Sequence, residues 1–172
     1  ITFGKTVQDI LASHGDDPLD EWAGTELTFG IFSHTRTMAK GFLRQIMRTF
    51  EGNNHLRALF PDIIWEKCAS DAPKWSENEG IILKRKTNPK ECTIEAWGLV
   101  DGQPTGKHFT VCIYDDVVTD ENTKTTDMIE KTTNAWEMSL NLSTQGGMQR
   151  YIGTRYHFND TYRVMMSRGV VV

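Results

Sequence analysis

The stretch from His108 to Glu121 reads His-Phe-Thr-Val-Cys-Ile-Tyr-Asp-Asp-Val-Val-Thr-Asp-Glu, and it decides the fold. Residues 109–114 form an uncharged run of β-branched and aromatic side chains, which is typical of a strand buried on both faces of a parallel sheet. Asp115 and Asp116 follow directly. Ligands of open α/β sheets bind outside the carboxyl ends of the strands, so the pattern predicts two carboxylates at a ligand-binding edge.

Two adjacent carboxylates at such an edge have a specific chemical use. One can hold Mg²⁺, which prefers hard oxygen ligands, while the other orients a water that attacks a nucleotide phosphate. The alternative is structural, because aspartate also favours turns and the amino-terminal caps of helices. The two residues by themselves leave both interpretations open.

Composition limits the classes of protein to which the chain can belong. Its 172 residues, 38% hydrophobic and 24% charged, fit one globular domain with its own core. A net charge of −4 excludes a bulk basic field, so any nucleic-acid contact must be local. The odd set of three cysteines contains no Cys-x-x-Cys pair, which disfavours a disulfide framework or a zinc site and favours a reducing compartment. The sequence also predicts no membrane span and no signal peptide.

The rest of the chain alternates between helical and strand patterns. Apolar spacing predicts helices at 1–13, 38–50, 122–142 and from 160 onward, and strands at 27–32, 80–86, 91–98, 109–114 and 148–152. Residues 14–24 read as a loop, and residues 169–172 as a strand that is beginning. The alternation predicts a mostly parallel α/β sheet with right-handed crossovers. The short connector 87–90, which contains Pro89, predicts an antiparallel hairpin between 80–86 and 91–98.

Three predicted strands end in polar clusters, at Ser33–Arg36, Asp115–Asp116 and Thr154–Arg155. If these strands are parallel, the three clusters line one crevice, which favours a functional interpretation over a structural one.

The tripeptide Gly4-Lys5-Thr6 matches the end of a phosphate-binding loop, G-x-x-x-x-G-K-[ST]. The strand and the first glycine of that loop would precede residue 1. The tripeptide reads more simply as an ordinary helical turn with an exposed lysine.

Basic residues gather in two places. Lys84, Arg85, Lys86 and Lys90 lie at the tip of the predicted hairpin and are candidate contacts for DNA or phosphate. A second row on the 38–50 helix reads more simply as a solvated face; it contains Lys40, Arg44 and Arg48. His157 and Asp160 lack a third metal ligand at recognisable spacing, so Asp160 is expected instead to begin the last helix.

Several of these segments resemble one known family, and the resemblance extends over nearly the whole chain. They are His-Phe-x-x-x-Ile-Tyr-Asp-Asp-Val-Val at 108–118, Tyr-Ile-Gly-Thr-Arg-Tyr-His-Phe-Asn-Asp-Thr-Tyr at 151–162, and the shorter segments 33–36, 82–86 and 96–100. The pattern resembles the large terminase subunit of tailed bacteriophages, the ATP-driven motor that packages DNA into procapsids.

The resemblance implies a P-loop NTPase fold of the RecA/ASCE-like class. Residues 1–172 would be a partial ATPase domain, with the first strand and the Walker A loop before Ile1 and without the nuclease domain. A chain of this kind is expected to hydrolyse ATP poorly by itself.

The resemblance also assigns roles to single residues. Asp115 would be the Walker B carboxylate that holds Mg²⁺, and Asp116 the catalytic carboxylate that orients the attacking water, although many members of the family have Asp-Glu here. Thr154 would sense the γ-phosphate within a coupling motif, and Arg155 would stabilise phosphate charge or pair with a nearby acid. Thr35 and Arg36 would contribute to ATP binding.

The implied cofactors and partners are ATP, Mg²⁺, double-stranded DNA, the portal protein and the small terminase subunit. The family resemblance further implies a homo-oligomeric ring on the portal, in the host cytoplasm and transiently docked on the procapsid. Two other classes of protein stay open. One is a Mg²⁺-dependent nuclease that uses the acids Asp115, Asp116, Asp120 and Glu121. The other is a non-catalytic DNA-binding or assembly module that uses the basic residues.

Overall fold

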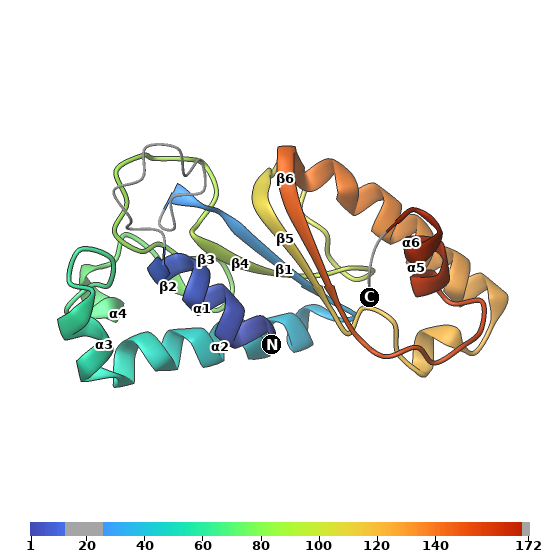
Figure 1. Cartoon of the computed structure of the whole chain (residues 1–172), viewed down its shortest axis with the longest axis horizontal. Coiled ribbons are helices and arrows are strands. Elements are labelled where there is room, and N and C mark those ends of the chain that lie inside the picture. Colours follow the sequence, from blue (N-terminus) through green and yellow to red (C-terminus); the bar gives the residue numbers. More distant parts are fainter. Residues whose placement is uncertain (13–25, 170–172) are drawn as a thin grey trace.

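The computed structural model describes residues 1–12 and 26–169 and shows an α/β fold built on a six-stranded mixed sheet (Figure 1). The strand order is β2-β3-β4-β1-β5-β6. Their bounds are β1 Phe29–Ser33, β2 Trp75–Ser76, β3 Gly80–Ile81, β4 Ile94–Gly98, β5 Phe109–Asp115 and β6 Ser143–Ile152. Strands β4, β1, β5 and β6 are parallel, whereas β2 and β3 run antiparallel to their neighbours. The predicted α/β class, the mostly parallel sheet and its antiparallel hairpin are therefore confirmed.

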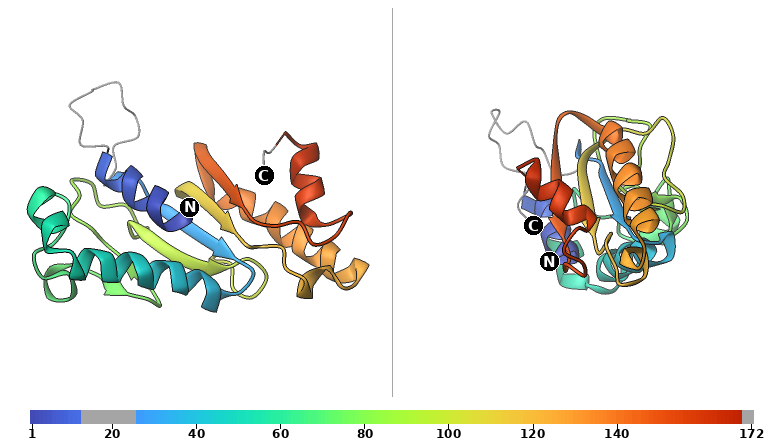
Figure 2. Two further views of the ribbon diagram at one scale, coloured as in Figure 1. Left: turned by 60° about the horizontal axis from the view of Figure 1, so that its bottom comes forward. Right: turned by 90° about the vertical axis from the view of Figure 1, so that its right-hand side faces the viewer.

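Helices cover both faces of this sheet, as the two views in Figure 2 show. The α-helices are α1 Thr2–Ala12, α2 Arg36–Gly52, α3 Asn54–Leu59, α4 Cys68–Asp71, α5 Thr126–Ser139 and α6 Thr161–Ser167, and short 3-10 helices span Glu121–Thr123 (η2) and Leu140–Leu142 (η3). None of the helices in the described ranges is long and apolar enough to cross a bilayer.

The two faces of the sheet bury two separate apolar clusters because side chains alternate along each strand. Ile31 and Ile113 belong to the first cluster, which also contains residues of α1 and α2. Phe32 and Tyr114 belong to the second, against α5 and α6. This double coverage explains why the 109–114 run carries no charge.

Aromatic rings bind the central strands together on the second face. The rings of Phe32 and Tyr114 stack at a centroid distance of 5.4 Å, and those of Tyr114 and Tyr151 at 4.8 Å. The hydroxyl of Tyr114 lies 2.9 Å from that of Ser139 in α5, so the one polar atom of this buried ring is paired. Such offset stacks add about 0.5–1.5 kcal/mol each to the burial of the rings.

The parallel pairing gives the sheet two chemically different edges. Residues 33, 98, 115 and 152 end β1, β4, β5 and β6, so these ends share one edge of the sheet. Ile81 pairs with Ile94, the first residue of β4, so the 82–93 connection lies at the opposite edge (Figure 1). The predicted acidic pair and the predicted basic tip therefore lie at opposite edges of the sheet.

Some predicted boundaries were wrong. β6 begins at Ser143, whereas residues 143–147 were expected to close the preceding helix. This segment is polar and glycine-rich, and it joins the sheet through the pairing of Ser143 with Phe109, with an irregularity before Met148. These residues have a low intrinsic propensity for strand, and pairing with β5 makes them part of the sheet in spite of it.

Other elements are also shorter than expected, among them the predicted 91–98 strand, which is β4 Ile94–Gly98. Only Gly80–Ile81 of the predicted 80–86 strand pairs as a β-strand. The predicted 122–142 helix is divided into η2, α5 and η3, and Thr125 caps α5. The predicted helices over 1–13 and 38–50 are present as α1 and α2. The predicted loop at 14–24 and nearly all of the predicted strand at 169–172 lie outside the described residues.

Gly30 in the centre of β1 offers a test of this packing. A Cβ at Gly30 would lie 2.6 Å from the ring of Phe109, which is fully buried. We expect Gly30→Ala to lower the free energy of unfolding by about 1–3 kcal/mol, since the ring must shift within a packed core. Urea denaturation followed by circular dichroism measures the change.

Gly41→Ala is the matched control. Gly41 lies within α2, and a Cβ there meets nothing within 4 Å. This substitution should raise stability by up to about 1 kcal/mol, because alanine is the better helix former. Equal stability of the Gly30→Ala variant and the wild type would contradict the packing described for β1.

Candidate functional site

The carboxyl ends of β1, β5 and β6 are joined by direct hydrogen bonds. The hydroxyl of Ser33 donates to the carbonyl oxygen of Asp115 at 2.6 Å. The backbone N–H of Asp116 donates to the carbonyl of Ile152 at 3.0 Å, and that of His34 donates to the carbonyl of Asp116 at 3.3 Å. The structure thus brings together the ends of the three strands whose polar residues the sequence singled out.

Asp115 is buried, and only 6% of it is exposed. It follows Val111 and Ile113 on the same face of β5, so it belongs to the side of the sheet that packs against α1. Burial raises the pKa of its carboxyl group, the Thr2 hydroxyl opposes that shift, and the neighbouring charge of Asp116 adds to it. A cation bound beside this carboxylate would stabilise its ionised form, because it would replace the hydration lost on burial.

Two buried hydroxyls of α1 lie on the same side. Thr2 and Thr6 are 2% and 0% exposed, and neither completes a regular hydrogen bond within the described residues, although Thr2 approaches Asp115 closely enough to lower its pKa. Leaving a buried hydroxyl unpaired costs about 1–3 kcal/mol. Gly4-Lys5-Thr6 lies within α1, and the backbone N–H of Lys5 donates to the carbonyl of Ile1 at 2.9 Å, so this tripeptide forms an ordinary helical turn.

Lys5 is engaged with its own helix. Its ammonium lies 2.6 Å from a carboxylate oxygen of Asp9 and 3.4 Å from the amide oxygen of Gln8. Asp9 also forms an ion pair with Arg150 of β6. These contacts tie the first turns of α1 to the last strand of the sheet.

Asp116 has a backbone conformation that few residues other than glycine adopt. Its φ is +47°, in the left-handed region, where aspartate is tolerated better than most residues. The Tyr162 hydroxyl donates to the carbonyl of Ile152 at 3.2 Å, and burial together with the nearby charge of Asp116 raises the pKa of Tyr162. A Cβ at Gly153 would lie 1.8 Å from that hydroxyl, so glycine is required there.

Thr154 and Arg155 are both exposed just beyond β6. The Nε of Arg155 lies 3.5 Å from Asp160, and its Nη2 donates to the carbonyl of Phe158 at 2.7 Å. Asp160 accepts the backbone N–H of Arg163 and begins α6, as predicted. In this structure Arg155 has therefore adopted the pairing with a nearby acid that the sequence had left as an alternative.

The residues after β1 are also held by structural contacts. Thr35 caps α2 by accepting the N–H of Met38 at 3.3 Å. The guanidinium of Arg36 lies 4.5 Å from the ring centroid of Trp97 and donates to the carbonyl of Asn78 at 2.8 Å. A phosphate contact by Arg36 would require its side chain to leave these partners.

The candidate DNA contacts lie at the opposite edge, and main-chain carbonyls hold three of them in place. Lys84 donates to the carbonyl of Pro61 at 2.7 Å, Arg85 to that of Glu91 at 2.9 Å, and Lys90 to that of Gly106 at 2.8 Å. A carbonyl fixes the position of a cation without neutralising its charge. By contrast, Arg44 of the α2 row pairs with both carboxylate oxygens of Glu77, at 2.7 and 2.8 Å.

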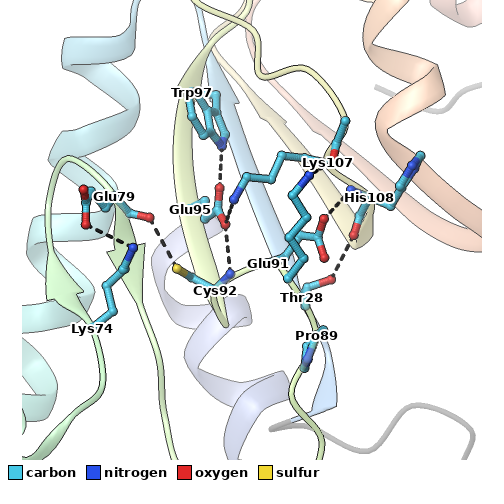
Figure 3. A network of polar contacts seen from close by, with 12 residues as sticks. Thr28, Lys74, Glu79, Pro89, Glu91, Cys92, Glu95, Trp97, Lys107 and His108 are labelled. Carbon is cyan, nitrogen blue, oxygen red and sulfur yellow. Dashed lines mark hydrogen bonds and ion pairs between the residues drawn. The ribbon is translucent and has the colours of Figure 1, made fainter.

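A buried carboxylate at this edge was missed by sequence reasoning (Figure 3). Glu95 is 1% exposed, and it accepts hydrogen bonds from the N–H of Cys92, the indole of Trp97 and the ammonium of Lys107. The neighbouring Glu91 accepts the backbone N–H of His108 at 2.9 Å. The network ties the start of β4 to the start of β5, so it has a structural role. The only sequence signal was that Glu95 and Trp97 share one face of a strand.

The Asp115 carboxylate is a hard oxygen ligand of the kind that Mg²⁺ prefers, and the Thr2 hydroxyl of α1 lies close to it. Across the described ranges, no group of three or more His, Cys, Asp and Glu side chains could hold a metal ion. The acids proposed for the nuclease alternative, Asp115, Asp116, Asp120 and Glu121, therefore do not form a ready two-metal site.

No protein-family model matches the chain, and no curated protein matches it.

The raised pKa of Asp115 predicts a pH-dependent stability. An ionised carboxylate whose folded pKa exceeds its unfolded value destabilises the native state above that pKa. We expect Asp115→Asn to raise the free energy of unfolding at pH 7 in metal-free buffer. The gain should fade as pH falls through the folded pKa and vanish below the unfolded value of about 3.9.

Asp62→Asn is the control, since Asp62 is exposed, and it should change stability little at any pH. Urea titrations of the three proteins at pH 7 and at lower pH separate the cases. A loss of stability in Asp115→Asn at pH 7 would show that the ionised form is favoured in the folded state.

Proposed function

We propose that this chain is the ATPase module of a viral DNA-packaging motor, which couples ATP hydrolysis to translocation of double-stranded DNA into procapsids. The observation that carries the proposal is that Asp115, at the end of a buried parallel strand and directly before Asp116, lies beside Thr2 in the first turn of α1. In this proposal residues 1–172 are part of the ATPase domain of a terminase large subunit.

A P-loop fold would make α1 the helix that follows the phosphate-binding loop. The amino terminus of such a helix attracts phosphate through its free N–H groups and its dipole. The strand before the loop would lie along β6, which is the outermost strand of the described sheet. A groove of about 610 Å³ runs there between α1 and β6 and is lined by Ile1, Lys5 and residues 149–152. This groove supports the placement.

Each residue of the site then has a chemical role. When bound, Mg²⁺ would neutralise charge on the β- and γ-phosphates. Asp115 would hold that ion, and the lysine and hydroxyl of the phosphate-binding loop that precedes α1 would contact the phosphates and the metal. Asp116 would accept a hydrogen bond from the attacking water and orient it in line with the γ-phosphate. Thr154, exposed at the end of β6, would sense the γ-phosphate.

DNA would contact the other edge of the sheet. Lys84, Arg85, Lys86 and Lys90 form a cationic surface, which we call the amino-edge patch. Because this patch and Asp116 lie at opposite edges of the sheet, ATP hydrolysis would act on the DNA through a movement of the domain. Partners in the proposal are the portal protein, the small terminase subunit and further copies of this chain in a ring on the portal. The place of action would be the host cytoplasm, at the procapsid.

The first test of the proposal is ATP hydrolysis by the protein extended at its amino end to include the phosphate-binding loop. Asp116→Asn should lower kcat by about two orders of magnitude or more, because the amide cannot take up a proton from the water. Asp120→Asn, an exposed acid in the following loop, should retain the wild-type rate. DNA cleavage with Mg²⁺ and no nucleotide turnover would instead support the nuclease alternative.

A second test concerns the amino-edge patch. Lys86→Gln with Lys90→Gln should weaken duplex binding and reduce the slope of log K against log salt by about two, if each lysine contacts one phosphate. The basal ATPase rate should stay unchanged. Lys124→Gln with Lys131→Gln removes the same charge from exposed positions in and before α5. Equal loss in both pairs would mean that binding depends only on net charge.

A further inference from the structure

We infer that Asn122 is a positioning residue for Asp116, and that His34 completes its hydrogen-bond network. The inference rests on the proposed function, in which Asp116 orients the attacking water. Neither Asn122 nor His34 is among the acids, threonines and cations to which the sequence assigned catalytic or ligand-binding roles.

The left-handed conformation of Asp116 needs support from its surroundings. The N–H of Asp116 is held by β6 and its carbonyl by the N–H of His34, so the backbone is clamped between two strand ends. The chain beyond it, Val117 and Val118, is buried in the second cluster. A turn of this kind is retained where neighbouring groups determine it.

Asn122 supplies the side-chain part of that support. It is 6% exposed, and its amide oxygen accepts the N–H of Thr119 at 2.9 Å. Its amide nitrogen donates to the carbonyl of Val117 at 2.8 Å and lies 3.1 Å from Nδ1 of His34. One buried side chain therefore joins three segments: η2, the 117–119 loop and the residue after β1.

Donor and acceptor roles follow from this arrangement. A backbone N–H can only donate, so the atom of Asn122 that faces Thr119 must be its oxygen. The amide nitrogen must then face His34, which makes Nδ1 an acceptor and places the imidazole proton on Nε2. Nε2 of His34 lies 3.9 Å from the exposed carboxylate of Glu121. The contact with Asn122 therefore uses Nδ1 of His34 as the acceptor.

The orientation of Asp116 should therefore depend on Asn122 and, to a smaller extent, on His34. Leucine has nearly the shape of asparagine but neither donates nor accepts, so Asn122→Leu removes all three contacts. His34→Ala removes one contact and leaves the backbone N–H of residue 34 in place. His34→Asn can present an amide oxygen close to the position of Nδ1 and should restore that contact.

The test measures kcat and KM for ATP in the amino-terminally extended protein. Asn122→Leu should lower kcat at least tenfold with KM within twofold of wild type, and His34→Ala should lower kcat about threefold or more. His34→Asn should recover kcat to within twofold. On an Asp116→Asn background, Asn122→Leu should cost no further activity, because it acts through that carboxylate.

The outcomes separate this inference from the proposed function. Full activity of Asp116→Asn would overturn the proposed function itself. Inactive Asp116→Asn together with fully active Asn122→Leu and His34→Ala would overturn only the positioning role, as would equal losses from Asn122→Leu on both backgrounds. Should Asn122→Leu fail to fold, the His34 pair still decides. The Asn122 side-chain amide signal in a ¹H–¹⁵N spectrum, which should shift in His34→Ala and return in His34→Asn, reports the contact without nucleotide.

Discussion

The structure depends on the burial of β5 between two parallel neighbours. Its register with β1 on one side and β6 on the other buries all of its residues except Thr110, which is half-buried, and helices cover both faces of the sheet. Charged side chains cannot be placed inside such a strand without a large desolvation cost. The carboxylates of this segment occur where β5 ends, and there the same pairing puts them beside the ends of β1 and β6. The position of the acidic pair is thus a consequence of how the sheet is covered.

Local conformational and desolvation costs are concentrated at that edge. Asp115 is ionisable and buried, Asp116 has a positive φ, and two buried hydroxyls of α1 have no regular hydrogen-bond partner in the described residues. Each of these features lowers the stability of the unliganded fold. Their occurrence together is typical of a site that binds a ligand, because a ligand that supplies the missing partners recovers the cost. A purely structural turn would not need all of them.

Separation of charge is a second consequence of the topology. The antiparallel hairpin returns the chain to the amino edge of the sheet, where main-chain carbonyls hold Lys84, Arg85 and Lys90. At the same edge, the buried Glu95 is fully satisfied by three donors and contributes rigidity (Figure 3). In a molecule with a net charge of −4, cationic side chains thus gather at the amino edge of the sheet, away from Asp115 and Asp116.

The sequence by itself determined the elements whose pattern is strong and local. The apolar run at 109–114, the amphipathic α2, the polar residues at three strand ends and the cap at Asp160 could all be predicted, because each depends on periodicity or on one residue's own chemistry. Tertiary structure alone decided the rest. The start of β6 at Ser143 depends on a partner strand, and the role of Asn122 depends on His34, 88 residues away in the chain. The pairing of Arg155 with Asp160 and the burial of Glu95 likewise require groups to meet in space, and no local pattern encodes such meetings.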